Sequence, residues 1–171
     1  MEGEKYQFNL MSINIRGLNE RKKRRSVFRW IKQNKIDICL VQESYSSAEV
    51  ENIWSNEWGR KIIFSHGTKH ARGVIILLRP GFDIEIENIY RDEIGRLLFL
   101  DVKIQDNPFK ICNIYAPNNE ESQKHFYQYL KKQLLQKSSR DHNIICGGDF
   151  NVIFNPAQDR KASTPFQKSK K

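Results

Sequence analysis

Cysteines and long hydrophobic runs are both scarce in this sequence, and each shortage excludes a class of protein. The three cysteines, Cys39, Cys112 and Cys146, are odd in number and each lies within an apolar stretch. Disulfide frameworks and zinc sites use cysteines in close pairs, so we expect buried free thiols. No apolar run approaches the roughly 18 residues that a membrane-spanning helix requires, and residues 1–5 lack a signal-peptide pattern. We therefore expect a soluble, intracellular protein without a membrane partner.

Acidic residues are also outnumbered. The 171-residue chain has 20 Asp and Glu against 29 Lys and Arg, which gives a net charge of +9 and an isoelectric point near 9.5. Such a charge favours a polyanionic partner, either nucleic acid or an anionic membrane surface. The length fits one domain, and 39% hydrophobic residues suffice for a core.

The apolar pattern predicts a mixed α/β protein that begins with a βαβ unit. A strand at 8–15, an amphipathic helix at 20–34 and an apolar strand at 36–43 predict two parallel neighbouring strands. Residues 46–49 resemble a capping box that begins a short helix. Its expected apolar residues are Val50, Ile53 and Trp54.

The second half of the chain is predicted to be rich in strands. Antiparallel hairpins are expected from strands at 61–65, 74–78, 82–90, 96–105 and 109–115, with breaks at Gly67, Pro80-Gly81, Gly95 and Asn107-Pro108. Asn118 or Asn119 then caps a helix whose core face is Phe126, Leu130 and Leu134, with Lys131, Lys132 and Lys137 toward its end. We expect an N-terminal extension at 1–7, one domain at 8–160 and a basic disordered tail at 161–171.

The first helix carries a basic run at 21–25 at its amino end, while Val27, Trp30 and Ile31 recur at helical spacing. Cations at that end oppose the helix dipole, so helix stability does not explain the run. It is a solvated basic face, part of a nuclear-localisation signal, or a patch that faces phosphates. The second alternative implies a nuclear protein.

The most informative stretch is 144–151, an apolar run that ends in Gly147-Gly148-Asp149-Phe150-Asn151. Two glycines before a carboxylate indicate a strand that opens onto a crowded site. In an extended chain, Asp149 and Asn151 project to the same side and could hold a metal or a phosphoryl oxygen. The alternative is an Asp-Phe-Asn turn that only ends the strand.

Three other predicted strands also end in polar residues, namely Asn14, Glu43 and Tyr115. In α/β sheets, ligands bind beyond the carboxyl ends of strands, so these residues could converge with Asp149 and Asn151. Mg²⁺ prefers oxygen ligands such as these. Each residue also has a simpler explanation: Glu43 as a solvent-facing strand end, Tyr115 as a turn-packing aromatic, and Asn14 as a residue that bonds its own backbone.

Two further features bear on the site. Arg72, before the strand at 74–78, either brings a guanidinium to the same edge or forms a structural salt bridge. His66 and His70 are four residues apart, a spacing that suits a metal only on a helix, and Gly67 argues against a helix there.

Five segments, in order, resemble the endonuclease/exonuclease/phosphatase superfamily of exonuclease III and apurinic/apyrimidinic endonucleases, and more narrowly the endonuclease domain of LINE-type retrotransposon polyproteins. They are residues 12–18 (SINIRGL), 40–44 (LVQES), 65–68 (SHGT) through 72–74 (RGV), 113–118 (NIYAPN) and 147–151 (GGDFN). The resemblance covers about residues 8–160. It implies a four-layer α/β sandwich and hydrolysis of DNA phosphodiesters that depends on Mg²⁺, with Mn²⁺ as an alternative ion and no small-molecule cofactor.

The resemblance also implies residue roles. Glu43, Asn14, Asp149 and Asn151 form the metal and phosphate site, Tyr115 contacts the scissile phosphate, and Asp149 with Asn151 activates water. Arg16, Arg72 and Asn118 are assigned to nucleic-acid contacts.

The end of the chain departs from the family pattern. Only 22 residues follow Asp149, and the second Asp and the closing Ser-Asp-His motif of the family are absent. We therefore expect an incomplete sandwich with impaired activity, or a part of a longer polyprotein. The alternative function is a non-catalytic remnant that binds DNA or RNA, and a phospholipid headgroup as substrate is a third hypothesis.

Overall fold

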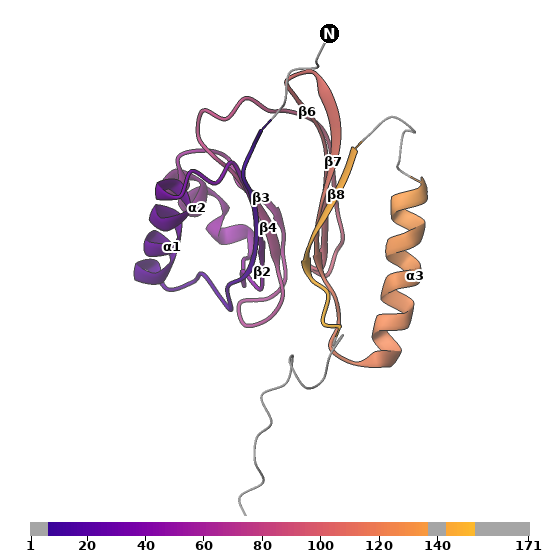
Figure 1. Cartoon of the computed structure of the whole chain (residues 1–171). Helices are drawn as coiled ribbons and strands as arrows, with labels where there is room; N and C mark the ends of the chain where they lie inside the picture. The colour runs from indigo at the N-terminus through magenta and orange to yellow at the C-terminus, as the bar shows by residue number, and fades with distance from the viewer. Residues whose placement is uncertain (1–6, 137–142, 153–171) are drawn as a thin grey trace, which may run out of the picture.

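Two four-stranded sheets pack face to face in the computed structural model, with helices on both outer faces (Figure 1). The structure describes residues 7–136 and 143–152. The layers are helix, sheet, sheet and helix, as predicted for a mixed α/β sandwich. The expected tail at 161–171, most of the extension at 1–7, Lys137 and the domain limit at residue 160 lie outside the described residues.

The first sheet has the strand order β1-β2-β4-β3. β1 (Leu10–Asn14) pairs in parallel with β2 (Ile38–Gln42), which confirms the predicted βαβ unit. β4 (Val74–Leu78) runs antiparallel to both β2 and β3 (Ile63–Ser65). All residues of β2 and β4 are buried, as expected for strands covered on both faces.

The helices outside this sheet are α1 (Arg21–Gln33), the 3₁₀ turn η1 (Ala48–Val50) and α2 (Glu51–Trp58). Two predictions about them are wrong. Trp30 is 50% exposed and Ile53 is 56% exposed, so neither belongs to the core. The capping box does not form either, because Ser47 at the N-cap makes no side-chain cap hydrogen bond.

The basic run of α1 is only partly solvated, because Arg24 is buried. Its Nε donates to Oε2 of Glu57 at 2.7 Å and its Nη1 donates to the carbonyl of Leu18 at 2.9 Å. The guanidinium also lies 5.3 Å from the ring centroid of Trp54. One cation of the run therefore joins α1 to α2 and cannot face a phosphate.

The second sheet has the order β5-β6-β7-β8. β5 (Glu85–Arg91), β6 (Leu97–Ile104) and β7 (Asn107–Tyr115) form the expected antiparallel hairpins. The last turn lies at Gln105 and Asp106, which both have positive φ, and not at Asn107-Pro108 as predicted. Pro108 fits inside β7 because proline is tolerated near the start of a strand.

α3 (Glu120–Gln136) covers the outer face of this sheet and leads to β8 (Asn143–Asp149), which pairs in parallel with β7. The backbone nitrogen of Ser122 donates to Oδ1 of Asn119 at 2.8 Å, so Asn119 is the cap. Phe126 and Leu130 are buried against the sheet with Leu134 partly buried, which confirms the predicted core face.

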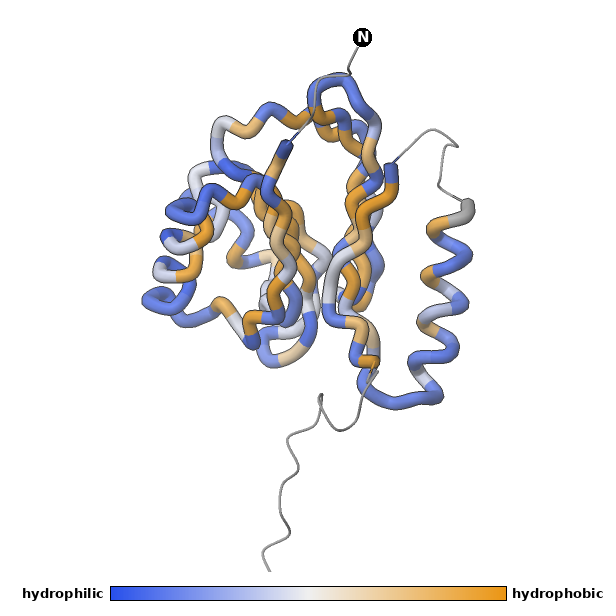
Figure 2. The backbone as a smooth tube through the Cα atoms, in the orientation of Figure 1, coloured by the Kyte–Doolittle hydropathy of each residue, from blue (hydrophilic) through white to orange (hydrophobic). Residues whose placement is uncertain are grey.

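Figure 2 shows hydrophobic segments along the facing strands of the two sheets. The shared core is made of side chains from both, among them Leu40 and Ile76 from the first sheet and Leu100 and Ile111 from the second. This packing fixes the distance between the sheets, and so places the strand ends of both at the same rim.

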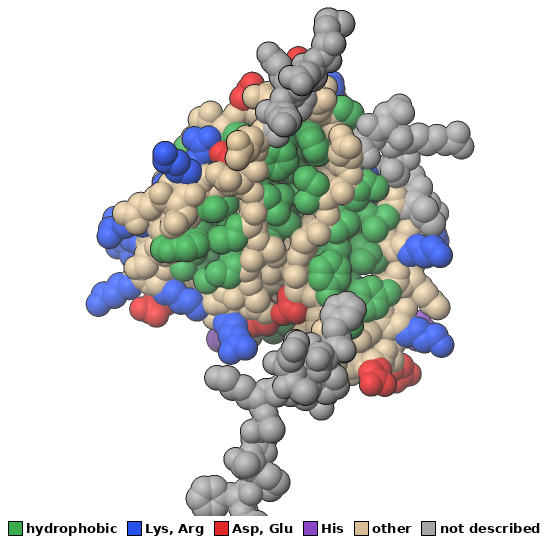
Figure 3. All heavy atoms as spheres, viewed as in Figure 1, with side chains coloured by type: hydrophobic (Ala, Val, Ile, Leu, Met, Phe, Trp, Pro, Cys, Tyr) green, Lys and Arg blue, Asp and Glu red, His purple; other side chains and the backbone are tan. Residues whose placement is uncertain are grey.

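Within the described residues, β1 and β8 are the outermost strands of their sheets. Figure 3 shows hydrophobic side chains exposed on the face of the molecule that it draws. Ile144 is 47% exposed. Cys39 and Cys112 are buried as predicted, whereas Cys146 is exposed, because it lies on this outer strand. No helix within the described residues is long and apolar enough to cross a membrane.

Candidate active site

The candidate site is centred on Asn14, the last residue of β1. Its amide nitrogen donates to Oε1 of Glu43 at 2.8 Å and to Oδ2 of Asp149 at 2.9 Å. Glu43 follows β2 of the first sheet and Asp149 ends β8 of the second. The structure therefore brings together three predicted site residues from two sheets, and one amide joins both carboxylates.

Glu43 accepts hydrogen bonds on both of its carboxylate oxygens. The hydroxyl of Tyr115 donates to Oε1 at 3.0 Å and the hydroxyl of Tyr45 donates to Oε2 at 2.8 Å. Burial by itself raises the pKa of Glu43, but the hydrogen bonds from Asn14, Tyr45 and Tyr115, with the charge of Arg16, lower that pKa below its usual value. Glu43 is therefore ionised at neutral pH.

Tyr115, at the end of β7, keeps its proton. Burial and the hydrogen bond to Glu43 raise the pKa of Tyr115 to about 12. The guanidinium of Arg96 lies 5.0 Å from the ring centroid of Tyr115, and its Nη1 donates to the Tyr115 carbonyl at 3.1 Å. A neutral hydroxyl is thus held in a fixed position as a hydrogen-bond donor.

Asp149 and Asn151 do not project from an extended chain, so that part of the prediction is wrong. β8 ends at Asp149, and Asn151 has a φ of +49°. The backbone nitrogen of Asn151 donates to Oδ1 of Asp149 at 3.0 Å, and its side-chain nitrogen donates to the carbonyl of Ala116 at 2.7 Å. The predicted Asp-Phe-Asn turn exists. It holds Oδ1 of the Asp149 carboxylate, while Asn14 binds Oδ2.

The two glycines before Asp149 are required by close packing. A Cβ on Gly147 would lie 2.7 Å from Cδ1 of Leu40, and one on Gly148 would lie 1.9 Å from the carbonyl oxygen of Ile114. The predicted crowding at this strand end is confirmed. Without a side chain at Gly147, β8 can approach Leu40 of the first sheet, and without one at Gly148 it can pair with Ile114 of β7, which lets Asp149 meet Asn14.

A buried polar pair connects the sheets beneath the site. Nε2 of Gln42 donates to Oδ1 of Asn113 at 2.7 Å, and Nδ2 of Asn113 donates to the carbonyls of Val41 and Ile75 at 3.0 and 2.9 Å. Gln42 precedes Glu43 by one residue and Asn113 precedes Tyr115 by two. These bonds therefore fix the position of Glu43 relative to Tyr115.

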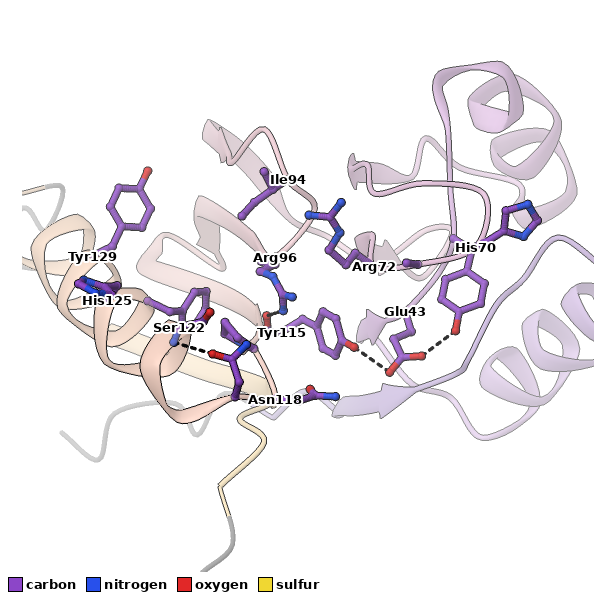
Figure 4. Close-up of a pocket in the computed structure, with 15 residues that line it drawn as sticks. Glu43, His70, Arg72, Ile94, Arg96, Tyr115, Asn118, Ser122, His125 and Tyr129 are labelled. Carbon is purple, nitrogen blue, oxygen red and sulfur yellow. Dashed lines mark hydrogen bonds between the residues drawn. The ribbon is translucent and has the colours of Figure 1, made fainter.

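A cleft of about 710 Å³ opens beside Glu43 and Tyr115 (Figure 4). Arg72 and Asn118, two of the predicted nucleic-acid contacts, line it, whereas Arg16 does not. Among the described residues Arg72 forms no ion pair, so its guanidinium remains available at the cleft. The salt-bridge alternative for Arg72 is not observed.

Sequence reasoning missed Tyr45 and Arg96. Arg96 also lines the cleft, and Tyr45 donates to Glu43. Arg96 directly follows the expected break at Gly95, whereas Tyr45 lies two residues beyond the predicted strand end at Glu43. A charged residue directly after a break was the signal that could have identified Arg96, and no pattern in the sequence pointed to Tyr45.

The oxygen atoms at the site suit a divalent cation. Glu43 and Asp149 lie on either side of one amide, and Mg²⁺ typically takes one or two carboxylates, with water and substrate phosphate as its other ligands. Asn14 presents its nitrogen to the carboxylates, while its Oδ1 accepts from the backbone nitrogen of Arg16 at 3.2 Å. With two carboxylates as protein ligands, a cation held here would keep open positions for water and substrate.

His66 and His70 do not form a histidine metal site. His66 contacts Oε1 of Glu51 through Nε2 at 2.8 Å and the hydroxyl of Ser46 through Nδ1 at 3.0 Å. His70 lies in the turn between Thr68 and Ala71 and lines the cleft. The sequence predicted that this segment is not a helix, and the structure confirms that neither histidine lies on one.

Comparisons with known proteins agree with this architecture. The model of the Endonuclease/Exonuclease/phosphatase family matches residues 7–166. An uncharacterised 149 kDa protein of transposon TX1 from Xenopus laevis is 27% identical over 152 residues, which are 89% of this chain and 12% of that protein.

Solved structures share the fold. TDP2 of D. rerio, in complex with a single-strand DNA product, has a TM-score of 0.67 at 16% identity, over 85% of this chain and 61% of that one. An AP endonuclease from Archaeoglobus fulgidus has a TM-score of 0.64 at 23% identity, over 88% of this chain and 60% of that one. The chain thus spans less than two thirds of these relatives.

Proposed function

This chain belongs to the Endonuclease/Exonuclease/phosphatase family, and on that premise we propose that it hydrolyses DNA phosphodiester bonds with the aid of Mg²⁺. The observation that carries the proposal is the single amide of Asn14 between Glu43 and Asp149. Two carboxylates held this close, next to a neutral phenol and a cleft lined by Arg72 and Arg96, suit a phosphate ester better than a neutral substrate.

Glu43 and Asp149 are the residues that would hold the cation, with Mn²⁺ as a possible replacement for Mg²⁺. When bound, the ion polarises the phosphoryl oxygens and offsets the negative charge that develops on them. Asn14 fixes the position of the two carboxylates relative to each other, because its amide nitrogen donates to both. Its own oxygen could reach the ion only after the amide has rotated, so we assign Asn14 mainly to positioning.

The remaining residues act on the substrate and on water. Tyr115, protonated at neutral pH, donates its one hydroxyl hydrogen to Glu43 in this structure. With substrate bound, it turns that hydrogen to a non-bridging phosphate oxygen, where negative charge grows in the transition state. Asp149 accepts a proton from the attacking water or orients that water. Asn151 holds Asp149 through its backbone nitrogen, and its side-chain amide would have to leave the carbonyl of Ala116 to donate to the phosphate.

DNA is the proposed substrate because of the charge of the protein and the kinds of relatives it has. The net charge is +9, and Arg72 and Asn118 line the cleft beside Glu43. Arg16 is exposed next to the site and could bind a phosphate farther along the strand. The TX1 protein, of which this chain matches 12%, supports a role as one part of a transposon polyprotein.

Nicking of supercoiled plasmid tests the proposal. We expect wild-type protein to convert supercoiled into open-circular DNA in Mg²⁺ and not in EDTA, and Asp149→Asn to be slower by about 100-fold or more. The matched control is Asp106→Asn, the same chemical change in the exposed turn between β6 and β7, which should leave the rate unchanged. Equal rates for wild type and Asp149→Asn would contradict the proposal.

Binding of nucleic acid without cleavage is the second candidate function. Arg21, Lys22, Arg25 and Arg29 are exposed on α1, so the basic charge could bind DNA or RNA even if the site were inactive. Salt-sensitive binding by a protein that does not nick DNA in Mg²⁺ would favour this candidate.

A further inference from the structure

The cleft extends beyond the phosphate-binding residues to α3. In Figure 4, Glu43 lies toward one end, His125 and Tyr129 of α3 lie at the other, and Tyr115 and Arg72 lie between them. A second hollow of about 410 Å³ adjoins the α3 end and shares Ile94 and Tyr129 with the first. The cleft is therefore longer than a single phosphate group requires.

Apolar side chains are exposed at the α3 end. Ile94, from the loop between β5 and β6, is 49% exposed, and Tyr129, on α3, is 42% exposed. Both belong to one wall of the cleft, with Phe126 buried behind them at 8% exposure. Large apolar side chains that share an exposed concave surface commonly mark a binding site, and phosphate chemistry gives no reason for this one.

The ring of Tyr129 is held in place. Its hydroxyl is hydrogen-bonded to the hydroxyl of Tyr90, whose ring stacks on Phe99 with a centroid distance of 5.3 Å and an interplanar angle of 27°. Phe99 is itself buried in the core under α3. A fixed aromatic ring loses little conformational entropy when a flat ligand stacks on it.

The cations of the cleft lie between this wall and Glu43. Arg96 and Arg72 line the same cleft, and Arg96 is half-buried over the ring of Tyr115. A ligand that reaches from Glu43 to Tyr129 therefore meets positive charge along its length and an aromatic surface at its end. An anionic backbone with a flat base attached has both properties.

We propose that Tyr129 and Ile94 form a stacking site for an unpaired nucleobase next to the phosphate that is cleaved. The inference rests on the proposed function and adds a substrate class to it, since a base held inside a duplex is stacked on its neighbours and cannot stack on Tyr129. Single-stranded DNA, or duplex DNA with an unpaired base beside the cleavage site, is the preferred ligand.

The test compares two single-stranded hexanucleotides with identical phosphates, oligo-dT and an all-abasic analogue, in EDTA so that no cleavage occurs. We expect wild-type protein to bind oligo-dT about tenfold more tightly than the abasic strand. Tyr129→Ala should lose this preference while its affinity for the abasic strand changes less than about twofold. Tyr129→Phe keeps the ring but removes the contact with Tyr90 that fixes it, so it should retain most of the preference.

Ile94→Ala should also weaken the preference for the strand with bases, because it removes apolar surface next to Tyr129. Ile53→Ala, at a 56% exposed position on α2, is the matched control. Equal affinity of the wild type for oligo-dT and the abasic strand would overturn the proposal. So would a Tyr129→Ala variant whose affinity falls by the same factor for both strands. Either result is distinct from a failure of the proposed hydrolysis, which is measured by nicking in Mg²⁺.

Discussion

Replacement of Asn14 by aspartate tests the electrostatics of the site by a measurement of stability alone. The side-chain nitrogen of Asn14 lies 2.8 Å from an oxygen of Glu43 and 2.9 Å from an oxygen of Asp149. In Asn14→Asp, an oxygen takes the place of that nitrogen, and three carboxylates meet where one donor had joined two. Asn14→Leu is the matched control, because it removes the same two hydrogen bonds without adding charge.

Both variants lose hydrogen bonds to charged groups, each worth about 1.5–3 kcal/mol when buried. The carboxylates are only half-buried and water can replace part of the loss, so we expect a cost of about 2 kcal/mol in the free energy of unfolding of Asn14→Leu. Two like charges 4 Å apart repel each other by about 4 kcal/mol at an effective dielectric constant of 20, and by about 1 kcal/mol in bulk water. The repulsion between the introduced carboxylate and each neighbouring carboxylate should lie between these values. A further loss of about 2 kcal/mol is expected for Asn14→Asp at pH 8 without metal.

This further loss should depend on pH and on Mg²⁺. Crowding raises the pKa of the introduced carboxyl above its value in the unfolded chain, so the folded state binds more protons. The difference between the two variants should therefore be small near pH 4 and grow as the pH rises toward the folded pKa. At 100 times its dissociation constant, Mg²⁺ should restore about 2.7 kcal/mol.

Urea unfolding, followed by circular dichroism at several pH values with and without Mg²⁺, measures these differences. The reasoning is refuted if the two variants are equally stable at pH 8 in EDTA. It is also refuted if the same concentration of Mg²⁺ stabilises Asn14→Leu as much as Asn14→Asp, because the third carboxylate would then add nothing to the binding of the cation.

Three further predictions concern residues outside the substrate cleft. The hydrogen bond from Arg24 lowers the pKa of Glu57, so this carboxylate stabilises the fold at pH values above its unfolded pKa. Glu57→Gln should therefore lower the free energy of unfolding by about 1.5 kcal/mol at pH 7, measured in urea, and by progressively less as the pH falls below about 4. The hydrogen bond from Cys112 lowers the pKa of Cys146 to about 7, so its alkylation by iodoacetamide should rise with pH around that value, and Cys112→Ala should shift this rise to higher pH. Asn113→Leu should cost about 3 kcal/mol in urea unfolding, because it leaves buried partners of the amide without hydrogen bonds, and unchanged stability would contradict that role.

The fold could be predicted where local patterns decide it. The βαβ unit, the β5-β6 and β6-β7 hairpins, and a cap at Asn118 or Asn119 follow from apolar periodicity and turn residues. The hairpin expected around Pro80-Gly81 does not form, because β4 and β5 belong to different sheets. The buried face of α1 could not be predicted in this way. Arg24 is buried because Glu57, 33 positions away, lies opposite it, and no periodic pattern in α1 contains that information. Trp30 has the spacing of a core residue, but its side chain is 50% exposed on the outer side of α1.

The site was predictable to the extent that strand ends define it. Asn14, Glu43, Tyr115 and Asp149 all end or follow strands, and the carboxyl ends of the parallel pairs β1–β2 and β7–β8 meet at one rim. Tyr45 was missed because its direction depends on backbone turns with positive φ at Glu43 and at Tyr45 itself. Sequence periodicity does not specify such turns for residues other than glycine.

The buried pair of Gln42 and Asn113 explains why the two halves of the site meet in one geometry. Apolar side chains could fill the same space, but they would allow the sheets to shift relative to each other, since apolar contacts have little directional preference. The amide of Asn113 is bound at three points, to Gln42 and to the carbonyls of Val41 and Ile75, and each bond has a preferred direction. Because Glu43 and Tyr115 follow this pair by one and two residues, we infer that polar contacts in the core set the position of catalytic groups at the rim, and Asn113→Leu should therefore slow nicking by more than its loss of stability alone accounts for.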